Sequence, residues 1–228
     1  MNSLKVLALA MLAVAFVPAA FAHDPTVYEP SVKVVSTADD PYLDTPHASA
    51  RLSAVYISPT GDGSFIDTTV EADSAWGGSL GWEFRCGHWV GIDLNAIYAK
   101  HDINVVGYGK VGETTFLPVT LGLNVHVTPE KSPVDVFVGA LFGYAMYDDL
   151  ETRVDGYSLK ADVDSNFVYG FNLGIEVPAP KRGWAFFAAV KYLVAEYNAA
   201  VTVDSVSAGD FAVDINPWIG QAGLAYRY

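Results

Sequence analysis

The sequence predicts an all-β fold: an eight-stranded antiparallel transmembrane β-barrel with short periplasmic turns and long extracellular loops. Three observations lead to this prediction. The 228-residue chain has a mean hydropathy of +0.25, yet no stretch after residue 22 approaches the length of a membrane-spanning helix. Eight segments of strand length alternate between apolar and polar positions. The connections between these segments alternate between short and long, which is typical of outer-membrane barrels.

The N-terminus has the pattern of a secretory signal peptide. Lys5 supplies a positive charge, residues 6–17 are almost entirely apolar, and Ala20-Phe21-Ala22 fits a small-residue cleavage site. We therefore predict Sec export with cleavage near Ala22 and a signal peptide over residues 1–22. A buried N-terminal helix is the alternative. Residues 23–47 are rich in Pro and Asp and are predicted to form an extended periplasmic leader, or else a small plug in the barrel mouth.

Composition excludes several classes of function. The net charge of -13 argues against nucleic acid as a partner. Cys86 is the single cysteine, so an internal disulfide cannot form. The five histidines lack metal-ligand spacing and are expected at the surface or in the leader, and no catalytic motif is present. We therefore expect no enzyme activity, no catalytic residue, no metal site and no cofactor.

The barrel itself is predicted to span residues 48–228. A tilted transmembrane strand needs about 9–11 residues, and each segment meets that length. In the last segment, for example, Trp218, Leu224 and Tyr226 share one face, whereas Gln221 and Arg227 share the other. The predicted strands are residues 48–58, 75–85, 88–100, 114–127, 134–147, 166–177, 184–198 and 212–228.

A soluble β-sandwich would alternate in the same way, so the period alone does not decide between the two folds. One face of each strand is nearly continuous in aliphatic residues, with Tyr and Trp close to the strand ends. The opposite face carries Gly, Asn and isolated charges. This distribution favours a lipid-facing band bounded by aromatic girdles over a sandwich core.

The connections support the same orientation. Short turns fall near residues 85–88, 128–133 and 178–183, and the long loops cover residues 59–74, 101–113, 148–165 and 199–211. Both chain ends of the barrel then lie on the side of the short turns, which is the periplasmic side in such proteins. Most of the acidic residues lie in the long loops.

Seven charged residues fall on the inward-facing parity of the predicted strands. Buried charges are costly unless they are paired, and an eight-stranded interior is just wide enough for side chains to fill. Because both signs are present, we expect structural ion pairs in the lumen, with a polar path for ions as the alternative. The candidates are Arg51, Glu83, Arg85, Asp93, Glu176, Lys191 and Arg227.

Five large apolar residues share the same inward parity. They would suit an apolar pocket for a hydrophobic ligand near the outer mouth, or they simply pack the lumen. The sequence leaves both interpretations open. This candidate apolar lining comprises Phe116, Phe137, Leu141, Phe187 and Leu193.

Several segments resemble the OmpW family of outer-membrane barrels. Leu117-Pro118-Val119-Thr120-Leu121 is similar to its Leu-Pro-Pro-Thr-Leu strand, with Val119 in place of a proline, and Asp214 to Trp218 resembles the start of its last strand. Residues 51–59 and 133–144 are similar to its first and fifth strands. The C-terminal alternation of Leu224, Tyr226 and Tyr228 resembles the signal read by the barrel-assembly machinery.

The resemblance implies a narrow, rather apolar barrel that lets small hydrophobic molecules cross the outer membrane passively and releases them sideways into the bilayer. The expected partners are outer-membrane lipids, lipopolysaccharide, the assembly machinery and small hydrophobic solutes. The alternative function is a non-transporting surface barrel that acts in adhesion, envelope integrity or partner binding through its acidic loops. A rim enzyme that uses His101 is the third hypothesis.

Overall fold

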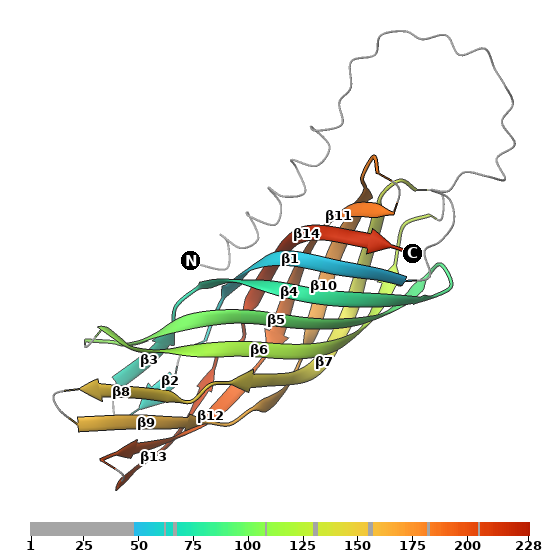
Figure 1. The fold of residues 1–228 in the computed structure, drawn as a ribbon. Helices are drawn as coiled ribbons and strands as arrows, with labels where there is room; N and C mark the ends of the chain where they lie inside the picture. The colour runs from blue at the N-terminus through green and yellow to red at the C-terminus, as the bar shows by residue number, and fades with distance from the viewer. Residues whose placement is uncertain are drawn as a thin grey trace, which may run out of the picture.

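The computed structural model describes residues 48–228 apart from positions 62, 66–67, 108, 130–131, 155–156, 182 and 205. The signal peptide and leader predicted for residues 1–47 lie outside the described residues. Eight antiparallel strands form a barrel in which each pairs with the next, and the last pairs with the first (Figure 1). These strands are β1 (Ala48–Ser58), β4 (Ala75–Cys86), β5 (Val90–Val105), β6 (Gly109–His126), β7 (Asp135–Tyr147), β10 (Asn166–Pro178), β11 (Trp184–Val194) and β14 (Trp218–Arg227).

The pairing register places apolar side chains outside and a mixed set inside. Leu52 on β1 lies opposite Leu224 on β14, and its neighbour Arg51 lies opposite Ala225. Because successive side chains point to opposite faces of a strand, Leu52 is 63% exposed whereas Arg51 is 5% exposed. The same alternation repeats around the barrel, so the predicted lipid-facing parity is confirmed.

Aromatic residues gather on the outside at two heights. Tyr192 contacts Trp218 with ring centroids 4.9 Å apart at the end where the long connections lie. Trp184 contacts Tyr226 with centroids 5.3 Å apart at the short-turn end. Two such belts bound an apolar band, as expected of a barrel that crosses a bilayer. Among the residues that the structure describes, no helix is long and apolar enough to cross a membrane.

The eight predicted strands are confirmed, with different limits. At their outer ends β5 continues to Val105 rather than residue 100, and β6 begins at Gly109 rather than residue 114. Two further strands, which are neighbours in the barrel, are shorter than predicted. The seventh ends at Val194 rather than at residue 198, and the last begins at Trp218 rather than at residue 212. Asn216 has a left-handed φ of 32° and precedes Pro217, which has no backbone N–H to donate. The Ile215 backbone N–H donates to the Ala195 carbonyl at 3.0 Å and ties the two breaks together.

The predicted long loops are largely β-structure. Six short strands continue the barrel beyond its long-connection end, and we call them the collar (Figure 1). They form a ladder of their own that joins the outer part of β5 through β3. Val70, Ile103, Ala161 and Val201 pack together inside it. The collar strands are β2 (Gly63–Phe65), β3 (Thr68–Ala72), β8 (Leu150–Val154), β9 (Tyr157–Val163), β12 (Glu196–Val203) and β13 (Val206–Asp214).

Candidate transport lumen

The half of the lumen nearest the collar is apolar. Phe116 on β6, Leu141 on β7 and Leu193 on β11 are each at most 2% exposed and belong to one cluster. Phe116 stacks on Tyr147 with centroids 5.6 Å apart. We call this cluster the apolar half; it comprises Val55, Ile57, Ala75, Ile97, Ala99, Phe116, Leu141, Ala145, Val168, Leu193, Ala195, Ala199, Ile215 and Ile219.

A small pocket lies where the apolar half meets the collar. The pocket is partly open, and its volume of about 20 Å³ is room for about one water molecule. His101 is a lining residue that contributes a polar ring, and that ring stands edge-on to Phe116 with centroids 6.0 Å apart. The His101 Nδ1 lies 2.7 Å from the backbone oxygen of Asp73. The remaining lining is Ile57, Pro59, Ala72, Ile103, Thr114, Phe116, Tyr147, Ile215 and Pro217.

The environment of His101 favours the neutral ring. The first eleven residues of β5, up to residue 100, are as many as a tilted strand needs to cross the bilayer, so His101 lies beyond the membrane-spanning part of the strand. Burial lowers the pKa of His101, although the Asp73 carbonyl and the Asp102 and Asp73 carboxylates act in the opposite direction. A carbonyl only accepts hydrogen bonds, so Nδ1 carries the proton and Nε2 carries the lone pair.

The other half of the lumen is ionic, and Arg51 is at its centre. Arg51 Nη2 lies 2.7 Å from Glu83 Oε2, and Nη1 lies 2.9 Å from Asp93 Oδ1. Nε donates to Glu176 Oε1 at 2.7 Å. All four side chains are at most 5% exposed. One guanidinium therefore joins strands β1, β4, β5 and β10 across the barrel, and we call this region the ionic half.

Three more predicted charges extend this network. Arg227 Nε donates to Glu176 Oε2 at 2.9 Å, and Lys191 Nζ lies 3.8 Å from Asp93 Oδ2. Arg85 pairs with Glu83 and also with Asp135. All seven charged residues singled out in the sequence thus occur in one cluster, as four cations and three carboxylates, and Asp135 is the fourth carboxylate.

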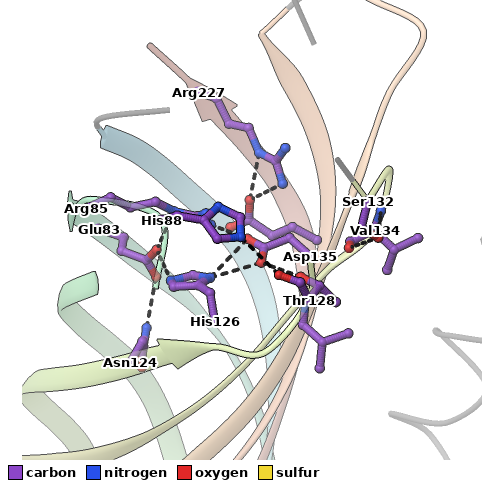
Figure 2. Close-up of polar contacts among 12 residues, drawn as sticks. Glu83, Arg85, His88, Asn124, His126, Thr128, Ser132, Val134, Asp135 and Arg227 are labelled. Carbon is purple, nitrogen blue, oxygen red and sulfur yellow. Dashed lines mark hydrogen bonds and ion pairs between the residues drawn. The ribbon is translucent and has the colours of Figure 1, made fainter. Parts of the chain in front are cut away.

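His126 bridges two carboxylates in the same cluster. Its Nε2 lies 2.9 Å from Glu83 Oε1, and its Nδ1 lies 3.0 Å from Asp135 Oδ1 (Figure 2). Asn124, which is on the same strand as His126, donates to Glu83 Oε2 at 2.9 Å. The expectation that the histidines lie at the surface is therefore wrong for His126 and His101, which are 0% and 4% exposed.

The candidate apolar lining does not form one surface. Phe137 and Phe187 lie in the ionic half, in a separate small cluster. The Arg51 guanidinium carbon stands 5.0 Å from the centre of each ring, a distance typical of cation–π contacts. These two phenylalanines therefore support the ion pairs, whereas Phe116, Leu141 and Leu193 face one another in the apolar half.

A layer of uncharged polar groups separates the two halves. Ser53 and Ser79 share a hydrogen bond of 2.6 Å, and Gln221 donates to Ser79 at 3.0 Å. On the ionic side, Asn172 donates to Asn124 at 3.1 Å. The lumen thus changes from hydrocarbon to amides and hydroxyls and then to paired charges along the barrel axis.

The wall beside the apolar half has an interruption. The β5–β6 ladder pairs Ala96 with Val119 and Ala99 with Phe116, but it contains no pair for the two positions between them. Pro118 lies in this interval and has no N–H to donate across the strands. On its other side, Pro118 still pairs with Ala145 of β7. The seam between β5 and β6 is therefore weaker at this height than above or below it.

Sequence reasoning missed two members of the ionic half, Asp135 and His126. Asp135 begins β7 two residues before the inward-facing Phe137, and His126 shares the parity of Asn124, so the alternation placed both inward. Within the described part of the chain, no group of His, Cys, Asp and Glu is arranged to hold a metal ion.

An apolar band between two aromatic belts around a closed sheet with a polar interior defines an outer-membrane β-barrel. The family model of the OmpW family matches residues 50–228, and the chain belongs to this family. It is accordingly a protein of the outer membrane, with the collar outside and the short turns in the periplasm.

Solved structures agree on the fold. OprG from Pseudomonas aeruginosa is 19% identical with a TM-score of 0.71, covering 81% of this chain and 96% of that one. Outer membrane protein W of E. coli is 18% identical with a TM-score of 0.53, covering 81% and 99%. Outer membrane protein AlkL is 16% identical with a TM-score of 0.58, covering 81% and 91%. A search of curated protein sequences gave no match.

Proposed function

We propose that this barrel lets small apolar molecules cross the outer membrane passively, entering through the collar and leaving sideways through the wall. The observation that carries the proposal is the division of the lumen into an apolar half and an ionic half. An apolar solute gains by entering the first and loses by entering the second, because it would separate buried paired charges without offering them a polar partner. Its path along the axis therefore ends at the polar layer.

The weak seam between β5 and β6 supplies the exit. Ile97 and Phe116 form the inner wall at this height, and both are buried in the apolar half. Tyr98, on the opposite face of β5, is 49% exposed on the lipid side. A solute that parts the strands beside Pro118 passes from one apolar environment into another and breaks few backbone hydrogen bonds.

Passage requires side chains to move. Phe116, Tyr147 and Leu193 fill the apolar half, and the pocket above them has room for about one water molecule. Dispersion contacts are individually weak and reform after a rotamer change, whereas paired buried charges do not separate cheaply. The apolar half is therefore the part of the lumen that yields to a solute.

The seam provides the test. We expect Pro118→Ala to restore one backbone hydrogen bond and to slow nonane uptake by cells about two- to tenfold, corresponding to one net hydrogen bond of about 0.5–1.5 kcal/mol. Pro178→Ala, the same change near the periplasmic end of β10, is the matched control and should leave uptake unchanged. Normal uptake by Pro118→Ala would remove the lateral exit. Equal uptake with and without the barrel would remove transport altogether and favour the non-transporting surface barrel.

The proposed partners follow from the position of the barrel in the outer membrane. The apolar band contacts outer-membrane lipid, and the collar is placed to meet lipopolysaccharide. Leu224, Tyr226 and Tyr228 share the lipid-facing side at the periplasmic end and are exposed, which supports their proposed role as the assembly signal. The absence of enzyme activity and of a cofactor remains a prediction.

A further inference from the structure

We infer that the mouth selects apolar molecules that bring one hydrogen-bond donor, such as alcohols, and that His101 Nε2 is the acceptor that recognises them. This inference rests on the proposed function and names its solute class. His101 is 96% buried, since its exposure is 4%, and it lines the pocket at the base of the collar. An acceptor at the edge of an apolar pocket rewards a ligand that donates to it, because little water reaches the nitrogen there.

The ring is oriented so that one nitrogen remains available. Nδ1 is turned towards the Asp73 carbonyl at 2.7 Å, and this contact fixes both the tautomer and the direction of the imidazole. Among the described residues no hydrogen bond of Nε2 is found, and Nε2 is not one of the fully buried polar atoms, so it keeps a small access to the pocket. The face of Phe116 holds the ring edge-on and prevents it from turning away.

The size of the pocket matches a single donor group. Its volume of about 20 Å³ admits one group the size of water, such as a hydroxyl, and its open side leaves room for the rest of the molecule. The Thr114 hydroxyl donates to the Asp148 backbone oxygen at 3.0 Å, so its proton is already engaged. A hydroxyl that donates to His101 can therefore lie in the pocket while its alkyl chain lies against Phe116 and Tyr147.

The charge of the collar adds a second criterion. Carboxylates outnumber cations several-fold in residues 59–74, 101–113, 148–165 and 195–217, where the basic residues are Lys110, Arg153 and Lys160. Lys110 is paired with Asp102 and Glu113 at 2.9 and 2.7 Å. A mouth of one sign repels ions of that sign. Neutral alcohols therefore reach His101, whereas alkyl carboxylates of the same length are repelled.

The test compares three matched probes in cells that carry the full-length barrel: 1-octanol, nonane and octanoate. 1-Octanol and nonane have the same number of heavy atoms and differ in the donor. We expect the octanol-to-nonane uptake ratio to fall about two- to tenfold in His101→Phe, the range of one neutral hydrogen bond. His88→Phe is the matched control, because His88 lies at the periplasmic end, and it should keep the ratio. A ratio also cancels any difference in the amount of folded protein.

Two further measurements sharpen the outcome. His101→Gln retains an acceptor at the reach of Nε2 and should recover part of the preference. In nanodiscs, the His101 Nε2 resonance should shift with 1-octanol and not with nonane. Unchanged ratios in His101→Phe with barrel-dependent nonane uptake would overturn this inference and leave the proposed function standing. Octanoate uptake equal to that of octanol would overturn the charge criterion, and no barrel-dependent uptake of any probe would overturn both proposals.

Discussion

The two halves of the lumen are built on the same eight strands but are closed by different forces. In the ionic half, Arg51 holds three carboxylates from three other strands at 2.7–2.9 Å. In the apolar half, Phe116, Leu141 and Leu193 meet only through side-chain packing. Charged pairs in a low-dielectric interior are directional and costly to separate, whereas packed hydrocarbon adapts to a guest of similar shape.

This difference indicates which half of the lumen can select solutes and which half can close a barrel of this size. An eight-stranded interior is filled by side chains, so it has no open pore whose width selects solutes. In the proposed function, the ionic half closes the periplasmic end and the apolar half is the adaptable part. The weak β5–β6 seam lies at the height of the apolar half, as the proposed lateral release requires.

The largest expected effect comes from breaking the ionic half. Arg51→Leu leaves Glu83, Asp93 and Glu176 buried without their shared cation, and we expect the free energy of unfolding to fall by about 3–5 kcal/mol. Urea titration of the refolded barrel in lipid measures this loss. Lys110→Ala removes an exposed cation with two carboxylate partners, as a control, and should leave the midpoint unchanged. A similar midpoint for both variants would show that the ion pairs do not hold the lumen closed.

An intermediate effect is expected from filling the space beside the phenylalanines of the ionic half. A Cβ on Gly174 would overlap the Phe137 ring, which is buried beneath the Arg51 guanidinium. We expect Gly174→Ala to destabilise the barrel by about 1–3 kcal/mol in the same titration, because overpacking forces the ring to shift. Gly78→Ala is the matched control, since its Cβ would meet only the Ser53 carbonyl oxygen at 3.8 Å. Equal stability of both variants would indicate a loosely packed ionic half.

The smallest effect is expected in the apolar half. Ile57 is fully buried and lines the pocket at the mouth. Ile57→Val removes one methylene, so it should cost about 0.5–1.5 kcal/mol of stability and yet speed nonane uptake by widening the constriction. The same change at Ile92, on the lipid face, is the control and should alter neither quantity appreciably. Slower uptake by Ile57→Val would argue against passage through this region.

The sequence was sufficient for the barrel and for the residues that face its interior, because strand alternation has a period of two and lipid exposure leaves a continuous apolar face. Arg51, Glu83 and Glu176 were found in this way. The collar was missed because its strands pair mainly with one another, and β2 and β3, with three and five residues, are too short to show a clear period. The sequence did not show that Phe116 and Phe137 lie in different halves of the lumen. Strand alternation tells which residues face inward, but it does not tell which residues they contact across the lumen.

The division of the lumen is tested most directly by mapping where an apolar solute resides. A photoactivatable alkane is given to cells that express the barrel, and its adducts are located by mass spectrometry. Adducts should fall on Phe116, Tyr147 and the β5–β6 wall around Tyr98 and leave the ionic half unlabelled. Adducts that continue past Arg51 to Arg227 would show that solutes traverse the whole lumen and would contradict closure by the ion pairs.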